Sequence, residues 1–144
     1  MRTTFVLVAI CSVALTAPAA AGAKTWRGKT GQDRAVMVRT GGDDRVKRVR
    51  ISWRARCQKG NYKSTTLFVP PFDVSSATAF EDAGAYRVNI PGGYRARHTA
   101  FVSATLDSVG VWRGTFGVRT RVTRKGKFVD SCRLKRVRWS AKEG

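Results

Sequence analysis

Acidic residues, histidine and cysteine are scarce in this sequence of 144 residues, and each shortage restricts what the protein can do. Nine Asp and Glu stand against 28 Lys and Arg, which gives a formal net charge of +19. One histidine and three cysteines spread along the chain are a poor ligand set for a closed four-ligand zinc site. The sequence also lacks glycine-rich phosphate loops and kinase-type motifs. We therefore expect no metal and no other cofactor, and no catalytic class is supported.

Long hydrophobic runs are also missing, apart from a short one near the start of the chain. After Arg2, an apolar stretch at residues 5–17 leads into Pro-Ala-Ala-Ala-Gly-Ala at 18–23, where two A-x-A patterns overlap. This is the pattern of a cleavable secretory signal peptide. The stretch of about 13 residues is too short for a membrane-spanning helix, which needs roughly 20. We expect residues 1–23 to be removed, by cleavage after Ala23 or alternatively after Ala21.

Export would change the role of the cysteines in residues 24–144, which we expect to form a single secreted domain without a transmembrane segment. Cys11 lies in the apolar run and leaves with the signal peptide, so Cys57 and Cys132 remain. Two thiols in an oxidising compartment tend to pair. We predict a disulfide between them, which closes a loop of about 75 residues and contributes roughly 4 kcal/mol of stability. The alternative is two separate buried thiols.

Apolar and polar residues alternate along most of the remaining chain, as in half-buried β-strands. Between Val49 and Cys57 the odd positions are apolar, and the even positions carry arginine or serine. The alternation changes phase near Lys135 and Arg136, which predicts a β-bulge there. The predicted long strands are 45–57, 94–106, 111–122 and 128–140, and the shorter ones are 25–30, 35–40, 65–69 and 85–90.

Turn residues separate these strands at hairpin distances, which favours antiparallel pairing in sequence order. Residues 74–82 are a weak helical candidate, which we interpret as a loop with at most one turn. Seven or eight strands without a long helix predict an all-β fold, either an antiparallel β-sandwich or, alternatively, a small β-barrel. We prefer the sandwich, because the disulfide would then join one sheet to the other.

Four short features of the chain resemble a group of bacterial proteins. They are residues 26–32 (WRGKTGQ), Cys57 after a strand that bears tryptophan, residues 114–116 (GTF), and the short step from Cys132 to residues 138–141 (RWSA). In these features the chain resembles uncharacterised secreted proteins of high-GC, actinobacterial-type bacteria. The resemblance covers nearly all of the chain after residue 23. It implies an exported β domain with one disulfide, and it implies no catalytic residue.

The surplus of positive charge falls on strand positions predicted to face solvent. Residues 24–144 keep 27 basic and nine acidic residues, a net charge of about +18. Such a face attracts polyanions, and arginine pairs well with phosphate or carboxylate. We therefore predict binding to anionic cell-envelope polymers or other polyanions, without reading of nucleic-acid sequence, because no recognised motif accompanies the charge. Phe101 and Tyr62 are the aromatic rings predicted to be exposed. The predicted binding residues are Arg48, Arg50, Arg54, Arg56, Arg95, Arg97, Arg113, Arg119 and Arg121, and Arg87 shares their outward phase.

Two alternatives remain open. The arginines can reflect codon usage in a high-GC genome, or can oppose edge-to-edge pairing of strands, without any ligand. The protein can also be a small secreted enzyme or enzyme inhibitor whose site lies in loops such as residues 70–82. A pocket that gathers His98 with Glu81 or Asp82 would favour the enzyme, and a continuous arginine surface would favour binding. The sequence does not set the oligomeric state.

Overall fold

A computed structural model describes residues 22–144, so the predicted signal peptide lies almost wholly outside the described residues. These residues form β-strands that pair only antiparallel. The strands are β1 (Thr25–Thr30), β2 (Ala35–Thr40), β3 (Val46–Cys57), β4 (Gly60–Phe68), β5 (Val74–Ser75), β6 (Ala79–Ile90), β7 (Tyr94–Leu106), β8 (Val111–Arg124) and β9 (Lys127–Glu143).

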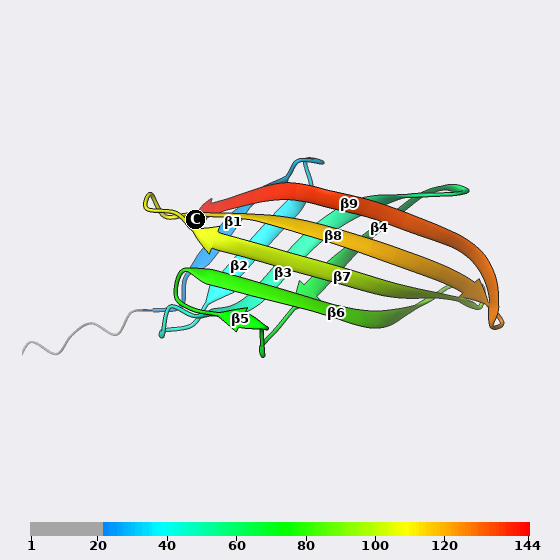
Figure 1. The fold of residues 1–144 in the computed structure, drawn as a ribbon, viewed down its shortest axis with the longest axis horizontal. Coiled ribbons are helices and arrows are strands. Elements are labelled where there is room, and N and C mark those ends of the chain that lie inside the picture. Colours follow the sequence, from blue (N-terminus) through cyan, green and yellow to red (C-terminus); the bar gives the residue numbers. More distant parts are fainter. Residues whose placement is uncertain (1–21) are drawn as a thin grey trace, which may run out of the picture.

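The strands form one sheet that curls into a partly closed ring. Their order is β4-β3-β2-β1-β9-β8-β7-β6-β5, and β3 additionally pairs with β9. In Figure 1 the long strands β6 to β9 lie side by side in front, and β1 to β4 cross behind them. The all-β antiparallel prediction is confirmed, but the strands make a single sheet instead of two. Twisted strands of 12 and 17 residues are long enough for β3 and β9 to change partners along their length, which lets the sheet meet itself.

The predicted disulfide between Cys57 and Cys132 is confirmed. The two cysteines are directly opposed where the end of β3 pairs with β9. The bond therefore does not connect two separate sheets. It fixes the position at which the ring closes, and it holds the neighbouring residue Arg56 opposite Arg133.

The inward faces of the strands fill the ring with apolar side chains. On β3 the predicted core positions, from Val49 to Ala55, are almost completely buried. Between β4 and β6 the ring is bridged by side chains: Trp53 Nε1 donates a hydrogen bond to Thr66 Oγ1 at 2.9 Å, and this oxygen lies 2.7 Å from the Tyr86 hydroxyl. The alternation of the sequence thus identifies the inner and outer faces of β3 correctly.

The β-bulge predicted from the sequence is present in β9. Lys135 and Arg136 together lie opposite the single residue Gly117 of β8, because the pairing register shifts there. The predicted phase change is therefore confirmed at the predicted residues. Gly117 is buried beneath the ring of Phe101, and a Cβ atom at this position would collide with that ring.

A second bulge in β9 lies at Val129, which the alternation of the sequence did not reveal. Val122 pairs with Asp130 and Thr123 pairs with Phe128, so Val129 is an extra residue. The bulge turns Phe128 to the outer side, where 48% of its surface is exposed. Within the strand predicted at 128–140, uninterrupted alternation places Phe128 in the core with the buried Cys132, and this prediction is wrong because of the bulge.

The segment 74–82 forms neither a helix nor a loop. It contains β5, a turn, and the start of β6, with Val74 paired to Glu81. The strands predicted at 65–69 and 85–90 are present and extend toward the N-terminus, as β4 and β6. Residues 22–144 contain no helix with the length and hydrophobicity needed to cross a membrane.

Candidate anion-binding site

Arginines on the outer faces of β3, β9, β8, β7 and β6 are brought into two adjacent rows by the register of the sheet. Directly opposed side chains in antiparallel strands have Cβ atoms roughly 4.5–5.5 Å apart. The two rows are two residues apart along the strands, which corresponds to roughly 7 Å. Every member is exposed. Read across the strands, the first of these arginine rows is Arg56, Arg133 and Arg119, and the second is Arg121, Arg97 and Arg87.

Five of the six arginines surround a hollow of about 530 Å³ at the disulfide, and Arg87 lies outside its lining. Cys57 and Cys132 line the same hollow, which we call the disulfide hollow. Its other lining residues are mostly polar and include Gln58, Thr99 and Ser131, with the exposed Phe128 as the aromatic member. The disulfide therefore borders the site, and it holds Arg56, the only one of the five arginines that comes from β3, beside the arginines of the other strands.

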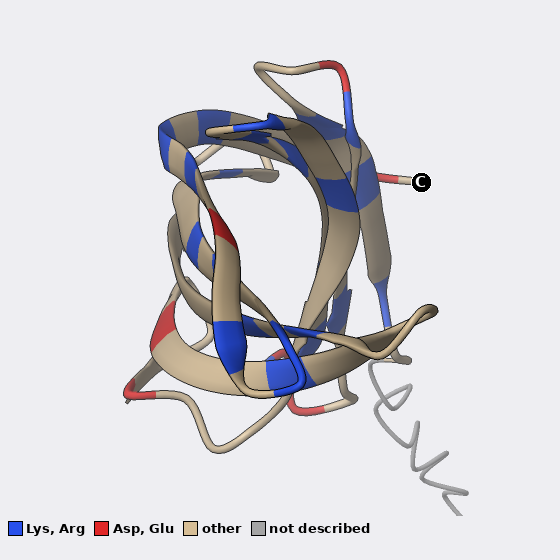
Figure 2. Cartoon of the chain, turned by 90° about the vertical axis from the view of Figure 1, so that its right-hand side faces the viewer, with Lys and Arg blue, Asp and Glu red and all other residues tan. Residues whose placement is uncertain are grey.

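The arginine rows have no carboxylate partner within residues 22–144, where the ion pairs use other cations. Asp130, beside Ser131 of the hollow, directs its oxygens to backbone N–H groups, at 3.1 Å from Gln58 N and 3.3 Å from Lys59 N. Figure 2 shows Lys and Arg segments around the ring, and fewer Asp and Glu segments, which lie both in connecting turns and on strands. Like charges that face each other across strands destabilise a sheet. The hollow therefore carries a positive potential that the described residues do not neutralise.

Phe128 adds a half-exposed ring to this charged hollow. The guanidinium carbon of Arg121 lies 4.9 Å from the centre of the ring. Such cation–π contact restrains the arginine without removing its charge. The site therefore combines a flat apolar surface with a fixed cation.

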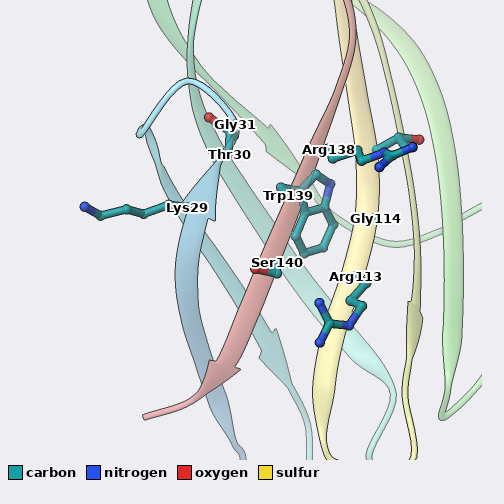
Figure 3. Close-up of a pocket in the computed structure, with 9 residues that line it drawn as sticks. Lys29, Thr30, Gly31, Arg113, Gly114, Arg138, Trp139 and Ser140 are labelled. Atoms are coloured by element: carbon teal, nitrogen blue, oxygen red, sulfur yellow. The ribbon is translucent and has the colours of Figure 1, made fainter.

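A second hollow, of about 650 Å³, lies where β1, β9 and β8 adjoin, and we call it the Trp139 hollow (Figure 3). Its cations are Lys29, Arg113 and Arg138, but two of them have partners: Lys29 Nζ is 2.7 Å from Asp33, and Arg113 Nε is 2.8 Å from Asp107. Figure 3 shows Lys29 pointing away from the indole. Trp139 is only 4% exposed, so its ring offers little surface to a ligand. This hollow is larger but much less cationic.

Acidic partners near the Trp139 hollow are held in the charged form. The backbone N–H of Val111 and then the guanidinium of Arg113 lower the pKa of Asp107. The ammonium of Lys29 lowers the pKa of Asp33 in the same way. These carboxylates therefore stay ionised at neutral pH and compensate the cations beside them.

The nine arginines predicted as a binding surface are all exposed, as their alternation predicted, but they do not form one patch. Four of them line the disulfide hollow: Arg56, Arg97, Arg119 and Arg121. The others are spread over the outer surface: Arg48 opposes Arg39, Arg50 lines a hollow with Arg27, Arg54 opposes Lys63, Arg95 lies at a hairpin end beside Thr123, and Arg113 pairs with Asp107.

The fifth arginine of the disulfide hollow, Arg133, and its aromatic residue, Phe128, were missing from the sequence-based set. Arg133 follows the inward-facing Cys132, so the alternation predicts that its side chain faces outward. That it lies opposite Arg56 and Arg119 depends on strand order, which the sequence does not show. Phe128 was hidden by the bulge at Val129. Strand order depends on contacts between residues far apart in sequence, and the bulge at Val129 leaves no phase change that the alternation shows.

His98 lies inside the ring and has no free access to the outer face. It is fully buried, and its Nδ1 is 2.8 Å from the hydroxyl of Thr120. Thr120 is also one of the residues that line the disulfide hollow. The rings of Tyr86, Tyr62 and Trp53 surround it, with centroids 4.8 to 5.5 Å away. The prediction that Tyr62 is an exposed ring is therefore wrong, because it faces inward. Burial lowers the pKa of His98, which keeps the imidazole neutral at pH 7.

The structure does not assemble the residues that would have favoured an enzyme. Within residues 22–144, neither the disulfide hollow nor the Trp139 hollow is lined by His98, Glu81 or Asp82. Burial raises the pKa of Asp82, but this carboxyl lies opposite Val102, away from the pairing of Tyr86 with His98. In the same part of the chain no three His, Cys, Asp or Glu side chains gather as a metal site.

Comparisons of the chain with protein-family models, with curated proteins and with solved structures found no match. The fold and the site therefore define the class of protein: an all-β, disulfide-bonded chain with a strongly cationic outer face.

Proposed function

We propose that this chain is a secreted, non-catalytic binding protein that holds an anionic polymer in the arginine rows. The observation that carries the proposal is the direct opposition of arginines across neighbouring strands, Arg56 to Arg133 to Arg119 and Arg121 to Arg97 to Arg87. Each opposed pair costs stability in the free protein. An anionic ligand removes that cost, and sites that break a local rule of sheet design are often functional.

The shape and chemistry of the disulfide hollow support a polymer as the ligand. Guanidinium groups bind phosphate or carboxylate oxygens in a two-pronged geometry. The rows extend across five strands, β3, β9, β8, β7 and β6, so they offer several anion positions in succession. A ligand with many charges releases many counterions on binding. Six such contacts make affinity fall by roughly a thousandfold between 50 and 200 mM salt.

The disulfide supports secretion as part of this proposal. Cysteine pairs persist in oxidising compartments and are rare in the reducing cytosol. Outside the cytoplasm the available polyanions include anionic cell-envelope polymers and released nucleic acid. The disulfide also maintains the contact between Arg56 and Arg133, so an oxidising environment would keep the site assembled.

The test uses two variants that remove the same charge from different places. In the site variant, Arg97, Arg119 and Arg121 are replaced by serine, and in the control variant Arg48, Arg50 and Arg54 are replaced by serine. All six side chains are exposed, so both variants should fold, which thermal melting checks. On immobilised heparin we expect the site variant to elute at much lower salt than the wild type, and the control variant to elute close to it. Equal elution of the two variants would mean that net charge alone causes retention.

A further inference from the structure

Aromatic rings accompany the cations along the outer side and the hairpin end of β7, β8 and β9. Three rings each have an arginine guanidinium over them: Phe101 with Arg136 at 5.4 Å, Phe128 with Arg121 at 4.9 Å, and Tyr94 with Arg124 at 5.0 Å. An arginine held over a ring presents its own flat guanidinium to a ligand. The surface therefore offers planar groups as well as charge.

Each of the three rings lines a hollow, and the hollows adjoin one another. The hollow with Phe101 has a volume of about 500 Å³, and it shares Thr99, Arg119 and Arg133 with the disulfide hollow that contains Phe128. The third hollow, about 490 Å³, contains Tyr94, Arg95 and Thr123, and Thr123 is paired directly with Phe128. Together they form a continuous series, which we call the β8 track.

The β8 track has the length of a polymer site. Phe101 is opposite Gly117, and Tyr94 is opposite Arg124, so the track covers seven residue steps of β8. At about 3.4 Å per residue this is about 24 Å. The two arginine rows, at Arg119 and Arg121 of β8, lie between Phe101 at one end of the track and Phe128 with Tyr94 at the other, so planar groups flank the cations on both sides.

We propose that the anionic polymer is single-stranded nucleic acid, bound without preference for base sequence; this inference rests on the proposed function. Every nucleotide brings one phosphate and one flat base, which match the guanidinium groups and the rings of the track. Cationic grooves with aromatic stacking surfaces are the usual way to hold single strands. Anionic polysaccharides and polyphosphate have no bases to stack, and duplexes hide the faces of their bases. The amide side chains in these linings are Gln58 in one hollow and Asn89 in another, so the track has no cluster of amides to read base edges.

The test compares a fluorescent 12-nucleotide oligothymidylate with an abasic oligomer of the same length and phosphate number, by fluorescence anisotropy on the purified protein. Stacking of even one or two bases should make the oligothymidylate bind about 10-fold or more tightly than the abasic oligomer. Phe128→Ala should remove most of this difference, and Phe128→Trp should retain it. Val109→Ala, which truncates another exposed apolar side chain, should leave it unchanged. An oligoadenylate of the same length should bind within a few-fold of the oligothymidylate.

The possible failures are distinguishable. Equal, salt-dependent affinity for the oligothymidylate and the abasic oligomer would overturn the nucleic-acid inference and leave the polyanion-binding function intact. A duplex that binds as tightly as the single strand would also overturn the inference. If neither oligomer nor heparin binds at low salt, the proposed function itself fails. Unchanged melting of the Phe128→Ala variant confirms that any loss is local.

Discussion

The disulfide hollow and the Trp139 hollow have similar volumes, about 530 and 650 Å³, and both contain basic residues, yet their electrostatics differ. In the Trp139 hollow, Lys29 and Arg113 already bind Asp33 and Asp107. In the disulfide hollow, five arginines lie close together, and none of them forms an ion pair with a carboxylate of residues 22–144. Neither the size of a cavity nor its number of cations identifies a binding site. What distinguishes the disulfide hollow is positive charge that the protein leaves uncompensated.

The largest expected effect is a loss of stability on removal of the Cys57–Cys132 disulfide, which lines the disulfide hollow and not the Trp139 hollow. Replacing Cys57 and Cys132 by serine removes the link between β3 and β9, which stabilises the fold by about 4 kcal/mol. We expect the melting temperature to fall by roughly 10 °C or more. Below that temperature, binding to heparin should weaken, because Arg56 is no longer held opposite Arg133. Heparin affinity equal to that of the wild type would show that Arg56 does not belong to the site.

A smaller loss of stability should follow from Gly114→Ala, which acts on the packing behind the Trp139 hollow. A Cβ atom here would collide with the backbone carbonyl oxygen of Ser103 and would lie 2.7 Å from Cζ2 of Trp139. Overpacking of this kind costs about 1–3 kcal/mol. Gly84→Ala is the matched control, since a Cβ atom at Gly84 meets nothing within 4 Å. Thermal melting should show a clear decrease for Gly114→Ala and none for Gly84→Ala, while heparin binding changes little in either variant. Equal melting temperatures would contradict the tight packing.

The pH dependence of stability separates the groups behind the two hollows. Burial keeps the pKa of His98 below its ordinary 6.5, so the unfolded chain takes up a proton at a pH where the folded chain does not. The free energy of unfolding should be highest above pH 6.5 and should decrease as the pH falls below it. Asp107 and Asp33, whose pKa values lie below the ordinary 3.8, should lose their contribution only at lower pH. Chemical denaturation at pH 7.5 and 5.5 measures the His98 effect. His98→Gln should abolish the difference, and its persistence in that variant would assign it elsewhere.

The smallest effect is expected from removing charge in the Trp139 hollow. Replacing Arg113 and Arg138 by serine should reduce heparin affinity only slightly, because Arg113 is already neutralised by Asp107. Replacing Arg119 and Arg121 by serine removes the same charge from the disulfide hollow and should have a much larger effect. The two double variants are compared by isothermal titration at one salt concentration. If the first loses as much affinity as the second, uncompensated charge is not what defines the site.

Alternation in the sequence predicted which side of each long strand is buried, because side-chain direction in a strand depends only on local backbone geometry. It placed Arg97, Arg119 and Arg121 outside and Val49 inside correctly. The cysteine pair and the first bulge were predictable for similar reasons, since two surviving cysteines allow one pairing and the phase change is local. Local patterns therefore predicted the character of each face.

Which arginines share a site depends on pairing between residues far apart in sequence. Arg56 and Arg133 meet only because β3 reaches across to β9, and no local pattern encodes that contact. The single curled sheet, rather than a sandwich, has the same origin. Phe128 was misplaced because a bulge of one residue reverses the phase without leaving a signal among polar neighbours. Long-range pairing thus determined the binding site, and it was the part that the sequence did not predict.

The most direct test of uncompensated arginine charge as the basis of binding is the slope of log affinity against log salt for heparin. Each lost anion contact should reduce this slope by about one. We predict that serine at Arg97, Arg119 and Arg121 lowers the slope by about two to three, and that serine at Arg48, Arg50 and Arg54 changes it by less than about one. Equal slopes for the two variants, or a wild-type affinity that does not depend on salt, would contradict the account.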